Sequence, residues 1–269
     1  FVKNKSAMIA LVIFLIIALM AIFGPMISPY SYDGMDTAIM NQRPSAAHWF
    51  GTDRFGRDLF TRVLYGARIS LMVGIVTAVI NTIIGVIYGG IAGYVGGRVD
   101  MWMMRLTDIL YSIPELLYII LIMLIFGSNV RSIIIGVCVA GWISMARMVR
   151  SQIITLKEQE FALAAFVLGA NSRRILFKHL IVNSLGTIIV TVTLMIPQAI
   201  FMEAFLSFVG VGISAPMASL GTLAQDARTY LEIFPYQMLF PVAAICVTIF
   251  SLNFIGEGLN SALNPKGKR

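Results

Sequence analysis

The chain has 269 residues, of which 58% are hydrophobic and only 12% are charged. A soluble protein carries about 25% charged residues, and the mean hydropathy of +0.87 also excludes an ordinary soluble fold. The net charge of +7 is spread along the chain, so it does not indicate nucleic-acid binding, which needs a clustered basic surface. We therefore predict an all-α integral membrane protein.

Six segments are predicted to cross the membrane, for which a helix needs about 20 apolar residues. Four of them contain no charged residue: Ser6–Tyr32, Ile69–Gly97, Leu180–Met202 and Ile233–Gly256. Two weaker spans lie between the second and third of these: Ile109–Val130, which contains Glu115, and Ser132–Ala146, which is short unless Arg147 and Arg150 reach back to the interface.

Most of the 20 Lys and Arg residues fall on the side of the N-terminus in this topology, which predicts that both termini are cytoplasmic. Lys3 and Lys5 precede the first span, as they would in a signal peptide. The apolar run is too long for a signal peptide, and no small-residue cleavage site follows it. We expect this span to remain in the protein.

A polar outer segment follows the first span and runs to Arg68. From Asp58 onward it places Leu59, Val63 and Leu64 on one side, which predicts an amphipathic helix that lies along the interface and leads into the second span. We divide the chain into residues 1–66 (the first span, the outer segment and this helix), 67–260 (a core of five helices) and 261–269 (a cytoplasmic tail).

The second span carries four glycines at a spacing of four, which places them on one helical face: Gly85, Gly89, Gly93 and Gly97. Small residues at this spacing let two helix backbones approach closely in lipid. We expect the face to contact another helix of the chain or a partner subunit. Membrane helices also tolerate glycine without a packing role, which would explain one or two of the four.

The segment Gly96–Asp108 is predicted to be a cytoplasmic loop, in which Asp100 and Arg105 are available to pair. Pro114 lies early in the third span and Pro197 lies in the fifth. A proline frees a backbone carbonyl and bends a helix, which happens beside pores and also in membrane helices without a pore.

Pro197, Glu203 and Ser207 are candidates for a pathway or a subunit contact. Glu203 has apolar runs on both sides, and an ionisable group at membrane depth is costly unless it faces water or a partner. Counted from Ser184 at 1.5 Å per residue, it lies about 28 Å along the helix, near the outer boundary. A simple interfacial anchor is the alternative.

No catalytic residue, metal site or cofactor site is predicted. The chain has no phosphate-binding loop and no paired metal-binding histidines, and its two histidines, His48 and His179, are far apart. Gly210–Ala215 imitates a dinucleotide-binding fingerprint but lacks the strand and helix around it, and Asp53–Asp58 lacks the ligand register of a calcium loop. If the protein uses energy, another polypeptide must supply it.

The segment between the fourth and fifth spans is predicted to form two short helices bent at Gly169. Glu160 favours a helix start, Phe161, Ala164, Ala165 and Leu168 form an apolar stripe, and Gly169 suits a left-handed helix end. A second helix can begin with Asn171 or Ser172 as its N-cap. The apolar face and its basic flank fit a groove on a soluble protein, and they equally fit a lipid surface.

This segment resembles the EAA loop of binding-protein-dependent ABC importer permeases. The matching residues are Leu163-Ala164-Ala165, then Gly169-Ala170, then His179-Leu180-Ile181-Val182-Asn183. The chain departs from the family at Leu163, where Glu is frequent, and at Val182, where Pro is usual. The departures concern a polar contact at the first position and a sharp exit turn at the second, and they leave the helix, glycine, helix geometry in place.

The resemblance extends over nearly the whole chain. The stretches FGTDRFGRDLFTRVLYGARISLMVG, GYVGGRVDMWMMRLTDILYSIPE, EAFLSFVGVGISAP and NFIGEGLNSALNPK are similar to the peptide permease family, in particular to the second of its two membrane subunits. This resemblance implies a type I ABC importer permease fold in a bacterial inner membrane. It also implies import of di- or oligopeptides by alternating access, or of nickel complexes or glutathione as in close relatives of the family.

The resemblance further implies partners and sites. The partners are a homologous second permease, two cytoplasmic ATPases that hold ATP and Mg, and an extracytoplasmic solute-binding protein. The implied ATPase-coupling residues are Glu160, Phe161, Ala164, Ala165, Gly169 and Ala170. The outer residues expected to face the second permease or the binding protein are Gly51, Thr52, Asp53, Gly56, Arg57 and Asp58. A self-sufficient channel or secondary transporter is less favoured, because the spans offer little beyond Glu115 and Glu203 for ion coupling.

Overall fold

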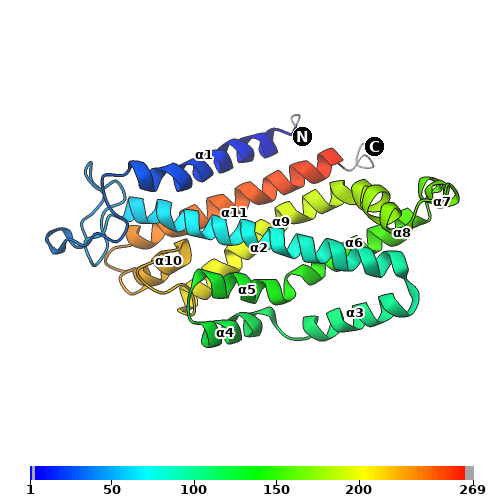
Figure 1. The fold of residues 1–269 in the computed structure, drawn as a ribbon. Helices are drawn as coiled ribbons and strands as arrows, with labels where there is room; N and C mark the ends of the chain where they lie inside the picture. The colour runs from blue at the N-terminus through cyan, green and yellow to red at the C-terminus, as the bar shows by residue number, and fades with distance from the viewer. Residues whose placement is uncertain (2–3, 264–269) are drawn as a thin grey trace.

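The computed structural model describes residues 1 and 4–263, and every regular element within them is a helix (Figure 1). The long helices are α1 (Lys5–Ile27), α2 (Leu59–Val95), α9 (Ile181–Val209) and α11 (Tyr236–Leu263). The shorter ones are η1 (Thr37–Ile39), α3 (Gly97–Tyr111), α4 (Glu115–Phe126), α5 (Val130–Ala140), α6 (Trp142–Lys157), α7 (Glu160–Val167), α8 (Ser172–Arg174), η2 (Ile175–Leu180) and α10 (Leu220–Arg228). Lys3, Lys266, Lys268 and Arg269, which entered the orientation prediction, lie outside the described residues.

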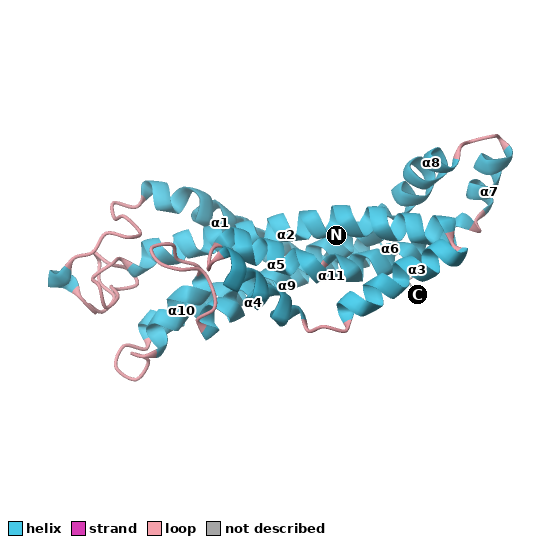
Figure 2. Ribbon diagram, turned by 60° about the horizontal axis from the view of Figure 1, so that its bottom comes forward, coloured by secondary structure: helices cyan, strands magenta, loops and turns pink. Residues whose placement is uncertain are grey.

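The helices form an elongated bundle with α2 at its centre, in contact with α1, α5, α6, α9 and α10. At one end of the bundle α7 and α8 project beyond the other helices (Figures 1 and 2). We call this the knob end. At the opposite end, the cap end, lie the loop from α1 to α2 and the segment that contains α10. We call this loop, residues 28–58, the cap. The described start of α1 and the end of α11 both lie toward the knob end (Figure 1).

Within the described residues, five helices are long and apolar enough to cross a membrane, and the bent pair α3 and α4 makes a sixth candidate. The prediction of an all-α membrane protein with six spans is therefore confirmed by length and composition.

The third span differs from its predicted form. The predicted loop Gly96–Asp108 is mostly helix α3, and α3 meets α4 at an angle of 74°. The break falls before Pro114, which disfavours helical backbone at the preceding residue. Charged residues made α3 look like a loop, but its aspartates are paired with the fourth span. Asp100 accepts two hydrogen bonds from Arg150, and Asp108 accepts one of 2.8 Å from Arg147.

The fourth span is also longer than predicted. Helices α5 and α6 together form a span over Val130–Lys157 rather than Ser132–Ala146. Arg147 and Arg150 are paired with Asp108 and Asp100 of α3. These pairs compensate the charges of the two arginines, and the helix continues past them.

The separate interfacial helix expected from Asp58 does not exist. These residues form the first turns of α2, which runs without a break for 37 residues. Thr61 and Arg62, expected on a polar face, are 1% and 2% exposed because the cap covers them. The spacing of Leu59, Val63 and Leu64, which suits an interfacial helix, therefore belongs to the buried start of α2 at the cap end.

The glycine face of α2 lies against α6. A Cβ atom on Gly85 would come within 2.6 Å of Met145, one on Gly89 would overlap the Ala146 carbonyl, and one on Gly93 would lie 2.8 Å from the Arg150 carbonyl oxygen. Gly97 does not share this face. It follows the end of α2 with a φ of +57°, and no atom lies within 4 Å of the position of its Cβ.

Replacement of Gly89 by alanine tests this contact. The methyl group would push the backbones of α2 and α6 apart, and overpacking of this kind costs roughly 1–3 kcal/mol. We expect Gly89→Ala to lower the unfolding midpoint of the purified protein in detergent. Gly90→Ala is the matched control, because the nearest atoms lie 3.6 Å from its Cβ position and alanine is the better helix former. Equal midpoints for the two variants would contradict a tight α2–α6 contact.

Candidate functional site

The knob, which we define as Glu160–Arg174, has the predicted helix, glycine, helix form. Helix α7 ends with two closing hydrogen bonds: the amide of Gly169 donates to the Phe166 carbonyl and the amide of Ala170 to the Ala165 carbonyl, each 3.0 Å. This pattern is a Schellman motif, and Gly169 supplies its left-handed residue with a φ of +81°. Asn171 then caps α8 by accepting from the Arg174 amide at 2.8 Å. The predicted bend at Gly169 is confirmed.

The base of the knob is fixed to the bundle by apolar contacts. Ala162 of the knob, and Ile175, Leu176 and Leu180 of η2 directly after it, are each at most 5% exposed and belong to one cluster with Ile153 of α6. Ala165 and Ala170 pack against the same cluster. The knob is thus held from both sides of its bend.

The tip of the knob, Phe166-Val167-Leu168, is exposed. These side chains are 68%, 82% and 87% exposed. The predicted stripe is therefore only partly right. Leu168 does face outward, but Ala165 is directed toward the bundle and Ala162, which the stripe omitted, is the most buried residue of α7. The stripe could not tell which face of a nearly all-apolar helix would be covered.

The two departures from the family pattern lie at exposed positions. Leu163 is 54% exposed and adds apolar surface to α7. Val182 is 51% exposed and lies in the first turn of α9, which continues from the π-helical turn η2 without a break. With valine here instead of proline, the knob leads into α9 through continuous helix.

At the cap end, Gly51–Asp58 forms a closed turn. Thr52 and Asp58 make an isolated antiparallel bridge. Between them the Asp53 carboxylate accepts from the amides of Phe55 and Arg57 at 2.8 and 3.0 Å and from Arg57 Nε at 2.6 Å. Gly56 has a φ of +70°, and a Cβ there would overlap the Asp36 carbonyl. Hydrogen bonds among its own residues therefore hold the turn closed.

Asp58 joins this turn to α2. One carboxylate oxygen accepts from the amide and the hydroxyl of Thr61, each at 2.7 Å, which caps the helix. The other oxygen lies 2.9 Å from His48 Nδ1. From α11, Gln237 Nε2 donates to the Thr52 carbonyl at 3.0 Å. The cap is therefore attached to two long helices.

This geometry corrects one expectation. The six residues expected to face a partner at the outer segment are all buried within the chain: Gly51, Thr52, Asp53, Gly56, Arg57 and Asp58. Of the same turn, only Phe55 is exposed and Arg54 half-buried. The six buried residues therefore stabilise the cap, while Phe55 and Arg54 contribute to its surface.

Glu203 of α9 is completely enclosed. Its carboxylate accepts from Ser70 Oγ of α2 at 2.7 Å and from Ser207 Oγ at 2.8 Å. Ser219, the N-cap of α10, donates to the Ser207 hydroxyl at 3.4 Å. The side chain therefore faces neither a pathway, nor a partner subunit, nor the interface, contrary to expectation. Pro197 is buried as well, and Ser207 is 1% exposed. Together these groups connect α2, α9 and α10 at the cap end.

A polar cleft of about 400 Å³ lies between α2, α4, α5 and α9. Its polar lining comes from Thr77, Asn81, Glu115, Ser144 and Gln198. Only Glu115 attracted attention in the sequence, although a polar residue such as Asn81 within the second span is itself a signal of water or a partner. The Asn81 side-chain oxygen is buried without a hydrogen-bond partner among the described residues.

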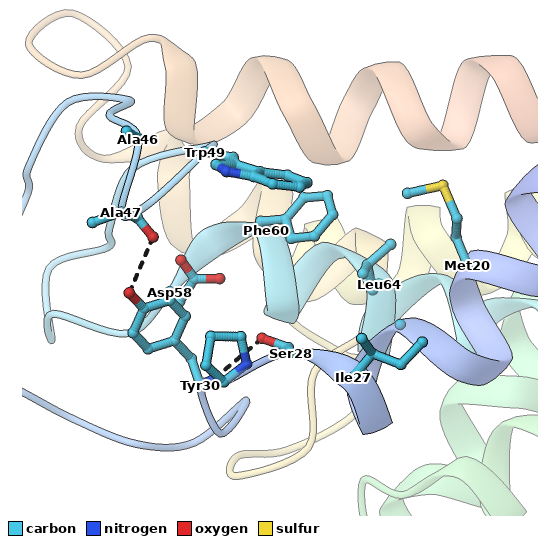
Figure 3. A pocket seen from close by; sticks show the side chains of 12 residues that line it. Met20, Ile27, Ser28, Tyr30, Ala46, Ala47, Trp49, Asp58, Phe60 and Leu64 are labelled. Carbon is cyan, nitrogen blue, oxygen red and sulfur yellow. Dashed lines mark hydrogen bonds between the residues drawn. The ribbon is translucent and has the colours of Figure 1, made fainter.

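A mostly apolar recess of about 460 Å³ separates α1 from the start of α2 (Figure 3). Met20 and Ile27 of α1 face Phe60 and Leu64 of α2 across it, and Trp49 of the cap closes one side. Its carboxylate, Asp58, is already bonded to Thr61 and His48. Beside the recess, the hydroxyls of Ser28 and Thr61, 2.6 Å apart, join the end of α1 to α2.

Removal of the Asp58 carboxylate is expected to loosen the cap. Asp58→Ala deletes the N-cap of α2, which costs about 1 kcal/mol, and also leaves His48 without its partner. We expect a lower unfolding midpoint and faster proteolysis within residues 28–57. Asp33→Ala is the control, since Asp33 is exposed and bonds only the nearby Ser31 hydroxyl. Unchanged proteolysis in Asp58→Ala would show that the cap does not depend on this carboxylate.

Comparisons with known proteins agree with this architecture. Residues 85–269 match the model of the family described as binding-protein-dependent transport system inner membrane component, and residues 1–44 match the N-terminal TM domain of oligopeptide transport permease C. The first of these matches covers more than half of the chain.

Three relatives are similar over nearly their whole length. The chain is 49% identical to the oligopeptide transport system permease protein OppC of Bacillus subtilis (99% of the chain, 87% of the relative). It is 48% identical to the dipeptide transport system permease protein DppC of the same organism (99% and 84%). It is 46% identical to OppC of Escherichia coli K12 (100% and 89%). The chain therefore belongs to the family of binding-protein-dependent transport system inner membrane components, together with the permease proteins of bacterial peptide transport systems.

Proposed function

We propose that this chain is a path-lining permease subunit of an ATP-driven importer of peptides. The names of its relatives support the substrate class, since they are permease proteins of oligopeptide and dipeptide transport systems. In this proposal the chain hydrolyses nothing itself. Two cytoplasmic ATPases bind ATP and Mg, a homologous second permease completes the path, and an extracytoplasmic solute-binding protein delivers the peptide.

The observation that carries the proposal is the exposed apolar tip Phe166-Val167-Leu168 on a knob whose base is packed into the bundle. Consecutive apolar side chains this exposed indicate an interaction surface. The knob projects beyond the end of the bundle (Figure 2), which suits insertion into a cleft of a soluble protein. A lipid surface would instead be met most readily by a helix lying flat with its basic residues beside the headgroups.

Movement of the knob would be transmitted along α9. The knob continues through η2 into α9 without a break, and 29 residues of helix span about 44 Å at 1.5 Å per residue. Near the far end, Glu203 links α9 to Ser70 of α2 and to Ser207, which in turn contacts Ser219 before α10. Closure of the ATPases at the knob would therefore shift the cap end as a rigid movement, as alternating access requires.

The polar cleft supports the position of the path. It is lined by amide, hydroxyl and carboxyl groups from four spans, whereas the outward faces of α1 and α9 are apolar. We infer that the second permease covers this cleft. Because the ATPases dock at the knob, the knob end is cytoplasmic in this proposal. The start of α1 and the end of α11, which lie toward the knob end in Figure 1, are then on the cytoplasmic side of the bacterial inner membrane.

Gly169 provides the first test. Valine at a φ of +81° is strained by about 1–2 kcal/mol, whereas asparagine tolerates this conformation. The space around Gly169 is open, with no atom within 4 Å of its Cβ position, so only the backbone is affected. We expect Gly169→Val to reduce ATPase copurification and peptide uptake severalfold, and Gly169→Asn to retain both. Equal uptake in wild type and Gly169→Val would contradict a role of the knob in coupling the ATPases to transport.

A substitution at Leu168 distinguishes docking on a protein partner from contact with a lipid surface. Leu168→Glu places a charge on the exposed tip without disturbing the core, and we expect it to abolish ATPase copurification in mild detergent. Lys178→Glu changes an exposed basic residue on the flank and should leave copurification intact. If Lys178→Glu released the ATPases while Leu168→Glu did not, the apolar tip would not be the docking surface.

A further inference from the structure

A third cavity, of about 300 Å³, lies at the cap end between the cap, α10 and the loop that follows α9. Arg57 and Arg62 line one side of it, and Ser128, Ser214, Thr222 and Gln225 provide further polar groups. We call it the arginine pocket. It is separate from the polar cleft and from the recess beside α1, with which it shares no lining residue.

Both arginines are deeply buried, and their donors are only partly used. Arg57 is 5% exposed and donates through Nε to Asp53 at 2.6 Å. Arg62 is 2% exposed and donates through Nη1 to the Tyr32 carbonyl at 3.0 Å. Arg62 Nε has no hydrogen-bond acceptor among the described residues, since the Asp53 carboxylate oxygen lies 3.6 Å away. A buried guanidinium with missing bonds is costly.

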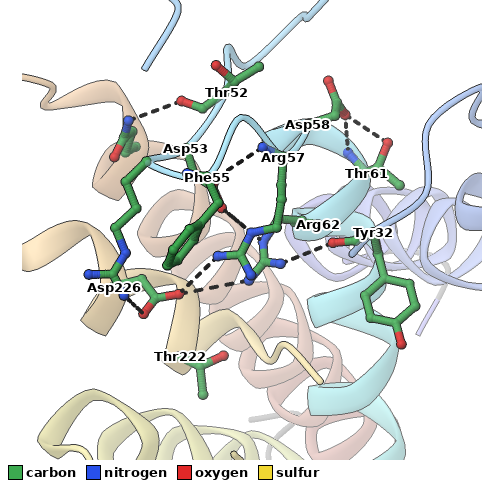
Figure 4. A network of polar contacts seen from close by, with 12 residues as sticks. Tyr32, Thr52, Asp53, Phe55, Arg57, Asp58, Thr61, Arg62, Thr222 and Asp226 are labelled. Carbon is green, nitrogen blue, oxygen red and sulfur yellow. Dashed lines mark hydrogen bonds and ion pairs between the residues drawn. The ribbon is translucent and has the colours of Figure 1, made fainter. Parts of the chain in front are cut away.

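Asp226 of α10 does not supply the missing bonds. Its carboxylate lies 3.7 Å from Arg54, 3.6 Å from Arg57 and 3.9 Å from Arg62, beyond hydrogen-bond distance in each case. Figure 4 shows the two buried arginines and Asp226 facing one another above Thr222. Three guanidinium groups thus surround the carboxylates of Asp53 and Asp226, and Asp33 is a third carboxylate near Arg62.

We propose that the arginine pocket binds a carboxylate group that enters from the cap end. One carboxylate would accept hydrogen bonds from the arginine donors that Asp226, at 3.6 and 3.9 Å, leaves free. Arginine binds carboxylates through two parallel hydrogen bonds, and such bonds are about twice as strong as neutral ones. The cavity has room for the carboxylate and several further atoms of the molecule that carries it.

The source of the carboxylate rests on the proposed function. A peptide carries a C-terminal carboxylate, and a solute-binding protein docked on the cap would offer acidic side chains. Both present the same chemistry to the pocket at the outer side of the membrane. Bound there, the carboxylate would connect the cap to α10 and so to the Ser219–Ser207–Glu203 contacts of α9.

The test uses the full chain in lipid nanodiscs with the subunits that copurify with it. Trialanine and trialanine amide differ only in the terminal carboxylate, so their effects on the unfolding midpoint are compared at equal ionic strength. We expect a saturable rise with trialanine and at least tenfold weaker binding of the amide, since a hydrogen bond to a charged group contributes about 1.5–3 kcal/mol.

Ser214 allows the pocket to be blocked without touching the arginines. Its side chain is exposed and lines the cavity. Ser214→Glu supplies an internal carboxylate, so we expect a higher midpoint without ligand and no further rise with trialanine. Ser214→Gln has the same size and no charge, and should respond as the wild type does.

Association of the solute-binding protein identifies the source. If trialanine has no effect, but Ser214→Glu weakens this association at least tenfold relative to Ser214→Gln, the carboxylate belongs to the binding protein. If trialanine and its amide act alike and both Ser214 variants bind the protein equally, the proposal is wrong. Absence of peptide uptake by the wild-type complex, together with an intact trialanine response, would count against the transport proposal alone, because the midpoint is measured without transport.

Discussion

The close contact between α2 and α6 sets the arrangement of the other helices. Gly85, Gly89 and Gly93 remove side chains from one face of α2, so that the backbone of α6 occupies their place. In lipid, apolar surface gives no strong preference for one helix neighbour over another, and close packing of this kind decides the pairing. Because α2 is the central helix, its contact with α6 positions α5, α9 and α1 around it.

The second constraint is that charged groups on the helices must find partners within the chain. Asp100 and Asp108 of α3 pair with Arg150 and Arg147 of α6, and Glu203 is enclosed by serine hydroxyls. The pairs of α3 with α6 and of Glu203 with Ser70 join helices that are distant in sequence. Charged residues in this chain therefore bind neighbouring spans to one another, in addition to lying at the ends of spans.

The two ends of the molecule differ in the kind of interaction they offer. The knob is apolar and exposed, with its bend closed by backbone hydrogen bonds around Gly169. The cap is polar and internally bonded, and the arginine pocket lies between it and α10. Helix α9 joins the two ends. A protein that must respond to one partner inside and another outside needs a rigid connection of this kind between unlike surfaces.

Much of the fold could be predicted from local properties of the sequence. Apolar runs located four spans well, and Gly169 followed by Asn171 placed the bend of the knob, because few other residues adopt the required backbone. The spacing of Gly85, Gly89 and Gly93 identified a contact face, although it could not name α6 as the neighbour. Family resemblance, carried by long matching stretches, supplied the class of protein.

Only the tertiary structure decided how the charged and polar residues are used. Hydropathy treats Asp100 and Arg150 as ends of spans, but their mutual bond lets α3 and α6 continue as helices. The Gly51–Asp58 motif looked like a surface for partners, yet its hydrogen bonds turn it inward. Arg57 and Arg62 meet Asp226 only because the cap folds back on α10. The sequence by itself determined the helices and the family, whereas the pairing of charges across helices depends on distances that local spacing does not contain.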